Sequence, residues 1–177
     1  MPLKLKRLLI LVIIITLIIP NMAYAQNPPK NVPFNVKVTG LENREDILNN
    51  LEQIKTIRKN FNTIDIRANS SPEQLQSMDT QLGNYVQQLE VVRANLENHI
   101  NTYRGSLPDE FFSEQVIFIA RGYIISLRYQ QLLIRALQNN TVEAKKLSYS
   151  SYMISVYFYM ARSDQMLAYI DTYFIYS

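Results

Sequence analysis

The chain contains one histidine, His99, and it lies on a regular line of apolar residues. Imidazole can bind a metal or transfer a proton near neutral pH, so this position is the first candidate for chemistry. The line advances in alternating steps of three and four residues, as a buried helical seam does. Its members are Leu75, Met78, Leu82, Tyr85, Leu89, Val92, Leu96, His99 and Tyr103. Because His99 comes one turn before the end of the line, we expect a half-buried imidazole where a structural seam meets water.

The sequence offers His99 no recognisable partner for catalysis. No serine or acidic residue is joined to it by a nucleophile motif, and Leu96, three positions earlier, excludes the Glu-x-x-His pair of di-iron bundles. The four glycines are dispersed, so the chain lacks a phosphate-binding loop. The absence of cysteine excludes thiolate metal sites and disulfides. We therefore expect a protein that is not an enzyme and holds no metal or cofactor.

A second group with chemical potential is a line of arginines. Arg121, Arg128 and Arg135 are spaced by seven residues and share one side of a helix. The residues three and four positions away are never acidic, so pairs within the helix are excluded. Two interpretations remain. In the first, the arginines interact across the bundle, with Arg121 near Glu90, Arg135 near Asp79, and Arg128 facing the ring of Tyr85. In the second, they form a site for an anion or an acidic partner.

Tyrosine is concentrated near the C-terminus. The residues are Tyr149, Tyr152, Tyr157, Tyr159, Tyr169, Tyr173 and Tyr176. Their spacing places them on more than one face of a helix, so they cannot all lie in a core. Exposed tyrosine provides a large contact area at low entropic cost, and we assign all of them except Tyr157 and Tyr176 to a candidate partner surface. The alternatives are boundary residues with hydrated hydroxyls, or a lipid interface.

An alternating segment near the N-terminus is a second candidate contact surface. Phe34, Val36 and Val38 alternate with polar residues, which predicts one short strand after a proline-rich lead, within the region 26–42. A single strand is not stable in water, so it would have to pack on the helices or add to a partner's sheet.

Two helices have clear ends in the sequence. The first is expected to begin with Asn43 as its N-cap, with acidic residues in the first turn and basic residues in the last. The second begins with Ser71 as N-cap and Pro72 in the first turn, Gln74 completes a capping box, and the helix ends before Gly105. The expected buried stripe of the first helix is Ile47, Leu48, Leu51, Ile54, Ile57 and Phe61.

Two further helices are expected, over 109–139 and from about residue 141 to the C-terminus. The third helix is apolar over a wide arc and should be the most buried. Arg121 and Arg128 interrupt it, and the uncharged part of the fourth helix is short, so neither is expected to span a membrane. Short connections make consecutive helices antiparallel. The predicted fold is therefore an all-α, antiparallel up-down four-helix bundle over 43–177, with coiled-coil spacing in its second helix.

The predicted bundle suggests an alternative role for His99. An exported four-helix bundle with one seam histidine and several methionines resembles the periplasmic b-type cytochromes in architecture. The resemblance implies a haem held between a histidine and a methionine. If the second and fourth helices are parallel and in register, Met166 lies nearest to the level of His99, which makes these two residues the ligand pair of the haem alternative.

The first 25 residues have the pattern of a cleavable signal peptide. Lys4, Lys6 and Arg7 precede an apolar run over 8–19, and the small residues at 23 and 25 fit a signal peptidase site. These three cations account for the whole formal charge of +3, so the rest of the chain has no basic excess that would indicate a nucleic acid partner. We expect export to the periplasm or the exterior.

The sequence leads to three functional hypotheses. The first is an exported, non-enzymatic helical bundle that acts by protein binding, as an accessory subunit of an envelope assembly or as a secreted factor. The second is a carrier of haem or another small ligand inside the bundle. The third is a secreted protein whose fourth helix acts on a membrane surface.

Overall fold

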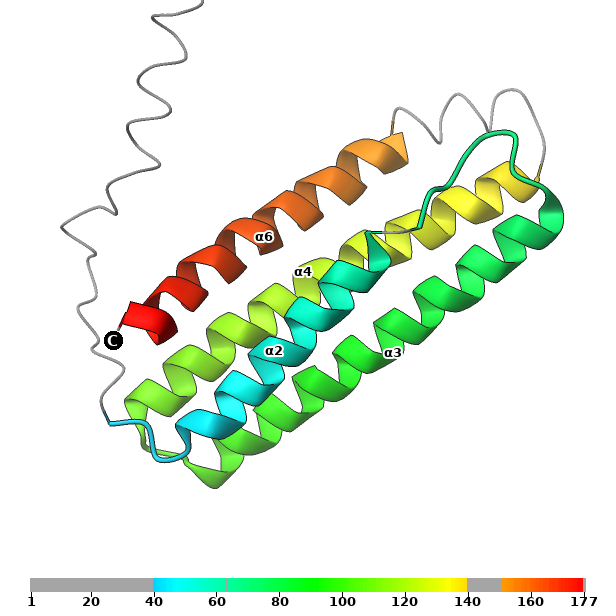
Figure 1. Ribbon diagram of the computed structural model, residues 1–177. Coiled ribbons are helices and arrows are strands. Elements are labelled where there is room, and N and C mark those ends of the chain that lie inside the picture. The colour runs from blue at the N-terminus through cyan, green and yellow to red at the C-terminus, as the bar shows by residue number, and fades with distance from the viewer. Residues whose placement is uncertain (1–39, 63, 140–150, 177) are drawn as a thin grey trace, which may run out of the picture. The chain divides into compact units, whose positions relative to one another are not determined.

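The computed structural model describes residues 40–62, 64–139 and 151–176, and these residues form four helices and no strand (Figure 1). The helices are α2 (Arg44–Phe61), α3 (Pro72–Thr102), α4 (Leu107–Gln138) and α6 (Met153–Tyr176). All four belong to one compact unit over 37–177. The prediction of an all-α four-helix bundle is confirmed. The expected signal peptide, the proline-rich lead with its strand and the start of the fourth helix near residue 141 lie outside the described residues.

The capping residues act as the sequence predicts. The Asn43 side chain accepts a hydrogen bond from the Asp46 amide at 3.3 Å, and Ser71 and Gln74 form a reciprocal capping box. Gly105 follows α3 with a φ of 99°, a backbone conformation that glycine adopts without steric cost. Helix α4 begins at Leu107, two residues earlier than expected, because Pro108 is favourable in a first turn.

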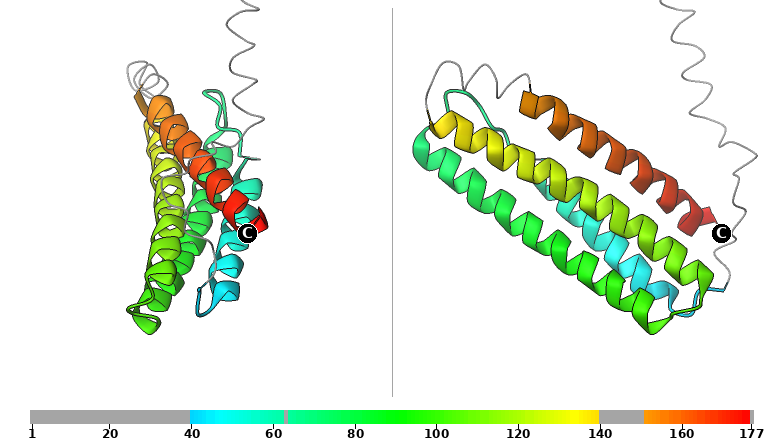
Figure 2. Two further views of the ribbon diagram at one scale, coloured as in Figure 1. Left: turned by 90° about the vertical axis from the view of Figure 1, so that its left-hand side faces the viewer. Right: turned by 180° about the vertical axis from the view of Figure 1, so that it is seen from behind.

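Helix α4 is the central element of the bundle. It packs against α3, α6 and α2, and Figures 1 and 2 show it between α3 and α6. Fifteen of its 32 residues are buried, against six of 31 in α3 and six of 18 in α2. Its expected place as the most buried of these three helices is confirmed. Of the predicted α3 seam, Leu75, Leu82, Leu89, Val92, Leu96 and His99 are buried.

Small residues bring α4 and α6 close together. A Cβ atom added at Gly122 would collide with the hydroxyl of Ser163 and would lie 3.6 Å from the Tyr159 carbonyl. One turn further along α4, the Ser126 hydroxyl donates to the Val156 carbonyl at 3.0 Å. The contact therefore depends on small side chains and a direct hydrogen bond from α4 to the α6 backbone.

We predict that Gly122→Val destabilises the protein by about 1 to 3 kcal/mol, because the added side chain forces α4 and α6 apart. Gly83→Ala is the matched control, since the nearest atom to its new Cβ is Gln131 Nε2 at 3.6 Å. Alanine favours a helix interior over glycine, so the control should gain up to about 1 kcal/mol. Urea unfolding measures both changes, and equal effects at the two positions would contradict this packing.

Candidate functional site

His99 lies at the centre of a buried charged cluster that joins three helices. Its Nδ1 is 2.8 Å from Oδ2 of Asp46 in α2, and its Nε2 is 2.8 Å from Oδ1 of Asp109 in α4. His99 is 2% exposed and Asp109 is fully buried. A carboxyl oxygen therefore lies within hydrogen-bonding distance of each ring nitrogen, and the cluster links one imidazole to two carboxyl groups.

The second carboxylate oxygen of Asp109 accepts hydrogen bonds from two segments, one before α2 and one before α4. It accepts hydrogen bonds from the Glu42 amide at 3.0 Å and from the Ser106 hydroxyl. Burial alone would raise the pKa of Asp109, but these two bonds and the bond from His99 outweigh burial and hold the pKa below its ordinary value. Asp109 therefore stays ionised and anchors the entry to α2 and the turn before α4.

This geometry corrects the expectation that His99 is half-buried, and it bears on the haem alternative. The expected half-buried position is wrong, because Asp46 and Asp109 satisfy both ring nitrogens and allow the ring to be fully buried. The haem alternative needs a nitrogen lone pair on His99, and both nitrogens already face carboxylates. Met166 is half-buried on α6. The Ser106 hydroxyl donates to Asp109 rather than to His99, which differs from a Ser-His-Asp arrangement.

A second polar cluster fastens α6 to α2. Arg58 binds Asp164 through two bonds, Nε to Oδ1 at 2.7 Å and Nη2 to Oδ2 at 2.8 Å. The Tyr123 hydroxyl of α4 donates to the same carboxylate at 2.6 Å. The guanidinium of Arg58 also lies 4.9 Å from the centre of the Phe61 ring. Lys55, one turn before Arg58 in α2, pairs with Asp171, two turns after Asp164 in α6.

The protonation states support this second cluster. Burial raises the pKa of the Tyr123 phenol far above its ordinary value, and its bond to Asp164 raises it further. Burial would also raise the pKa of Asp164, but the bonds from Arg58 and Tyr123 lower it more. Tyr123 is therefore a permanent donor and Asp164 a carboxylate at neutral pH.

Two carboxylates with lowered pKa make the fold sensitive to acid. For Asp109 and Asp164 the folded pKa lies below the unfolded value, so their contribution to stability is complete above about pH 4. We predict that the free energy of unfolding falls as pH drops from 4 through the lowered values. Urea unfolding between pH 2 and 6 measures this slope, which should be shallower in Asp109→Asn. An unchanged slope in that variant would contradict the prediction.

The outer face of α6 carries large apolar side chains that the other described helices leave exposed. The face consists of Ile154, Tyr157, Phe158, Ala161, Arg162, Gln165, Ala168, Tyr169 and Thr172. Ile154, Phe158 and Tyr157 are 70%, 62% and 60% exposed. Because these three are spaced by three and four residues, they adjoin on the helix surface. The opposite side of α6, with Val156, Ser163 and Ile170, is buried.

Among the tyrosine side chains that the structure describes, the predicted surface coincides with this face at Tyr169 alone. Tyr152 and Tyr159 are half-buried and lie against Tyr129 of α4, with ring centres 6.3 and 6.1 Å away. Tyr149 and the side chain of Tyr173 lie outside the described residues, as do Phe34, Val36 and Val38. The exposed aromatic pair Tyr157 and Phe158 was absent from the predicted surface. The exposed residues recur at helical spacing, which is the signal that could have found them.

The arginine line pairs with α3 in a different register from the predicted one. Arg121 lies 3.4 Å from Glu97, and Arg128 lies 3.0 Å from Glu90. Side chains lean toward the N-terminus of their own helix, so an arginine of α4 leans toward the α3–α4 turn and meets a glutamate nearer that turn. The predicted pair of Arg121 with Glu90 is wrong for this reason. Arg135 is exposed near the end of α4.

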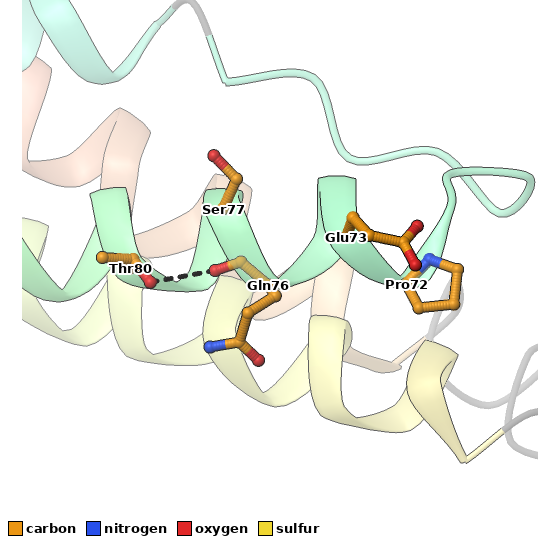
Figure 3. A pocket seen from close by; sticks show the side chains of 5 residues that line it. All are labelled: Pro72, Glu73, Gln76, Ser77 and Thr80. Atoms are coloured by element: carbon orange, nitrogen blue, oxygen red, sulfur yellow. Dashed lines mark hydrogen bonds between the residues drawn. The ribbon is translucent and has the colours of Figure 1, made fainter.

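Of the hollows in the described bundle, two lie near the start of α3 and the end of α2. One lies beside the first turns of α3, and all five side chains that line it come from this single helix (Figure 3). It is an open surface depression. The other, of about 250 Å³, lies between the end of α2 and the first half of α6. It is lined by Phe61, Asn62, Ile64, Asp65, Ile66, Gln130, Met153, Val156, Tyr157 and Met160.

Four charged residues of these clusters were not predicted from the sequence as site residues. Asp109 lies seven residues before the buried Val116, so extending the α4 stripe backward reaches it. Asp46 lies four residues before the buried Asn50 in the same way. Arg58 and Asp164 neighbour the buried Ile57 and Ser163, and their pairing across α2 and α6 leaves no local signal.

Among the described residues, no helix is long and apolar enough to cross a membrane. The same residues contain no group of three or more histidine and acidic side chains arranged to hold a metal ion. Comparison of the chain with protein-family models, curated proteins and solved structures finds no match.

Proposed function

We propose that this chain is an exported, non-enzymatic helical bundle that binds another protein through the outer face of α6. The observation that carries the proposal is the exposure of Ile154, Tyr157 and Phe158 as one adjoining group. The signal-peptide pattern of residues 1–25 supports export, and an envelope assembly or the exterior would then supply the partner.

The distribution of side chains on α6 supports binding over a purely structural role. Burying a large apolar side chain is worth about 1.5 to 3 kcal/mol, so a helix selected for stability alone places such residues inward. Helix α6 instead buries Ser163 against Gly122 and directs Phe158 to the surface. The described fold forgoes this gain in stability, whereas a bound partner would recover it.

The helix is also held firmly enough to present its face in one orientation. Its inner side packs closely on α4, and the Arg58–Asp164 and Lys55–Asp171 pairs fix it to α2. A pre-ordered surface loses less conformational entropy on binding, which favours affinity. Exposed tyrosine and arginine are the residue types that contribute most in protein interfaces.

Photo-crosslinking in the native host tests the proposal. A benzophenone amino acid is placed at Phe158 and, as the matched control, at Val91, an apolar residue of α3 that is 53% exposed. We expect a discrete protein adduct from position 158 that position 91 does not give. Equal labelling at both positions, or none at 158, would refute the proposal, and a lipid adduct would replace it with the membrane hypothesis.

A further inference from the structure

We infer that the partner of the outer face of α6 presents a carboxylate to Arg162 within an otherwise apolar contact. The inference rests on the proposed function and names the chemistry of its partner. Arg162 lies one turn after Phe158 on the exposed side of α6, about halfway along the outer face. It makes no ion pair with any residue in the described part of the chain.

The charges of α6 are segregated between its two sides. Both acidic residues of the helix, Asp164 and Asp171, face α2 and pair with Arg58 and Lys55. The outer face contains no acidic residue, so Arg162 is its one charge. A guanidinium enclosed by an apolar contact needs an anionic acceptor, because burying an unpaired cation is costly. A carboxylate suits it through two parallel hydrogen bonds.

Other occupants of this face fail to supply that acceptor. A symmetric contact with a second copy would add a second Arg162 and no carboxylate, because the face contains none. The first 39 residues of the chain also contain no aspartate or glutamate. An anionic membrane attracts clusters of basic residues, whereas the outer face offers a single cation. Charge complementarity therefore favours a different protein with an acidic residue amid apolar neighbours.

The face has the dimensions of a helix-packing surface. From Ile154 to Thr172 it extends over 18 residues, or about 27 Å at the rise of an α-helix. Ile154, Phe158 and Arg162 follow one another at intervals of four residues, the row that packs into the groove of a neighbouring helix. A helix of the partner that carries the carboxylate fits this row.

The test uses the full chain in the host fraction where the position-158 adduct forms. The variant R162K is treated with a water-soluble carbodiimide, which joins a lysine amine to an adjacent carboxylate as an amide with loss of water. Mass spectrometry then maps the linked residues. We expect a link between position 162 and an aspartate or glutamate of the same partner protein. The variant R162Q, which cannot form the link, should reduce the position-158 adduct about tenfold through the lost charged hydrogen bonds.

The outcomes separate this inference from the proposed function. A full adduct yield from position 158 in R162Q, with no carbodiimide link in R162K, overturns the acidic partner while binding through α6 stands. Absence of the position-158 adduct in the parent chain refutes the proposed function itself. An adduct between two copies of this chain, or with lipid, overturns the inference. The control R104Q, which removes an exposed arginine just after the end of α3, should leave the adduct unchanged.

Discussion

Replacing Asp109 with leucine is expected to lower the free energy of unfolding by about 3 to 5 kcal/mol, the largest effect of any substitution considered for this bundle. The change leaves Nε2 of the buried His99 without its hydrogen-bond partner and also removes the acceptor of the Glu42 amide and the Ser106 hydroxyl. A buried polar group that loses its hydrogen-bond partner costs its full desolvation free energy. Urea unfolding at pH 7, followed by circular dichroism, measures the loss.

Two controls distinguish the buried cluster from a general effect of removing negative charge. Glu114 is an exposed carboxylate of the same helix, and Glu114→Leu should change the stability by no more than about 0.5 kcal/mol. The Asp46 side chain is 41% exposed, so water can replace part of its role, and Asp46→Leu should cost less than Asp109→Leu. Similar small losses in all three variants would show that the His99 cluster contributes little.

Replacing Arg58 with leucine is expected to cost about 2 to 3 kcal/mol and to loosen α6. The variant removes both hydrogen bonds to Asp164 and leaves that carboxylate with only the Tyr123 hydroxyl as a described partner. Hydrogen exchange should then accelerate in the α6 amides more than in those of α3. Unfolding by urea and exchange detected by mass spectrometry provide the two measurements.

Arg58→Lys is the informative companion to this variant. Lysine keeps the positive charge and loses the planar, two-pronged geometry that matches a carboxylate. We expect it to recover only part of the stability. Full recovery would mean that charge alone holds α6 against α2, and an unchanged α6 exchange rate in Arg58→Leu would show that the packing on α4 is sufficient.

Local sequence signals predict the fold of this chain well. Helix ends follow from residues that act on their own neighbours, and the Ser71–Gln74 capping box and Gly105 function where the sequence places them. The α3 seam repeats over four heptads, so a few half-buried members such as Met78 do not obscure it. Because the apolar repeat of α3 extends over many residues, it still predicts the helix when single members are not fully buried.

The charged clusters are less predictable because they depend on register between helices. His99 is visible as a seam residue, but the partners that bury it lie 53 and 10 positions away. Arg121 pairs with Glu97, which lies two turns along α3 from the predicted Glu90, so a small error in the level at which two helices meet changes the cross-helix partner. The exposed face of α6 depends likewise on which side meets α4. The close contact between Gly122 of α4 and Ser163 of α6 determines which side of α6 is buried.

The proposed binding role of the outer face of α6 requires that this face contribute little to folding. The direct measurement is the adduct yield from a benzophenone at Gln165, in the middle of that face, with and without the triple change I154S/Y157S/F158S. The prediction is a yield reduced at least tenfold while the urea midpoint stays within error, because the three side chains are exposed. An unchanged yield would contradict the proposed role, and so would a triple variant that loses its folded state.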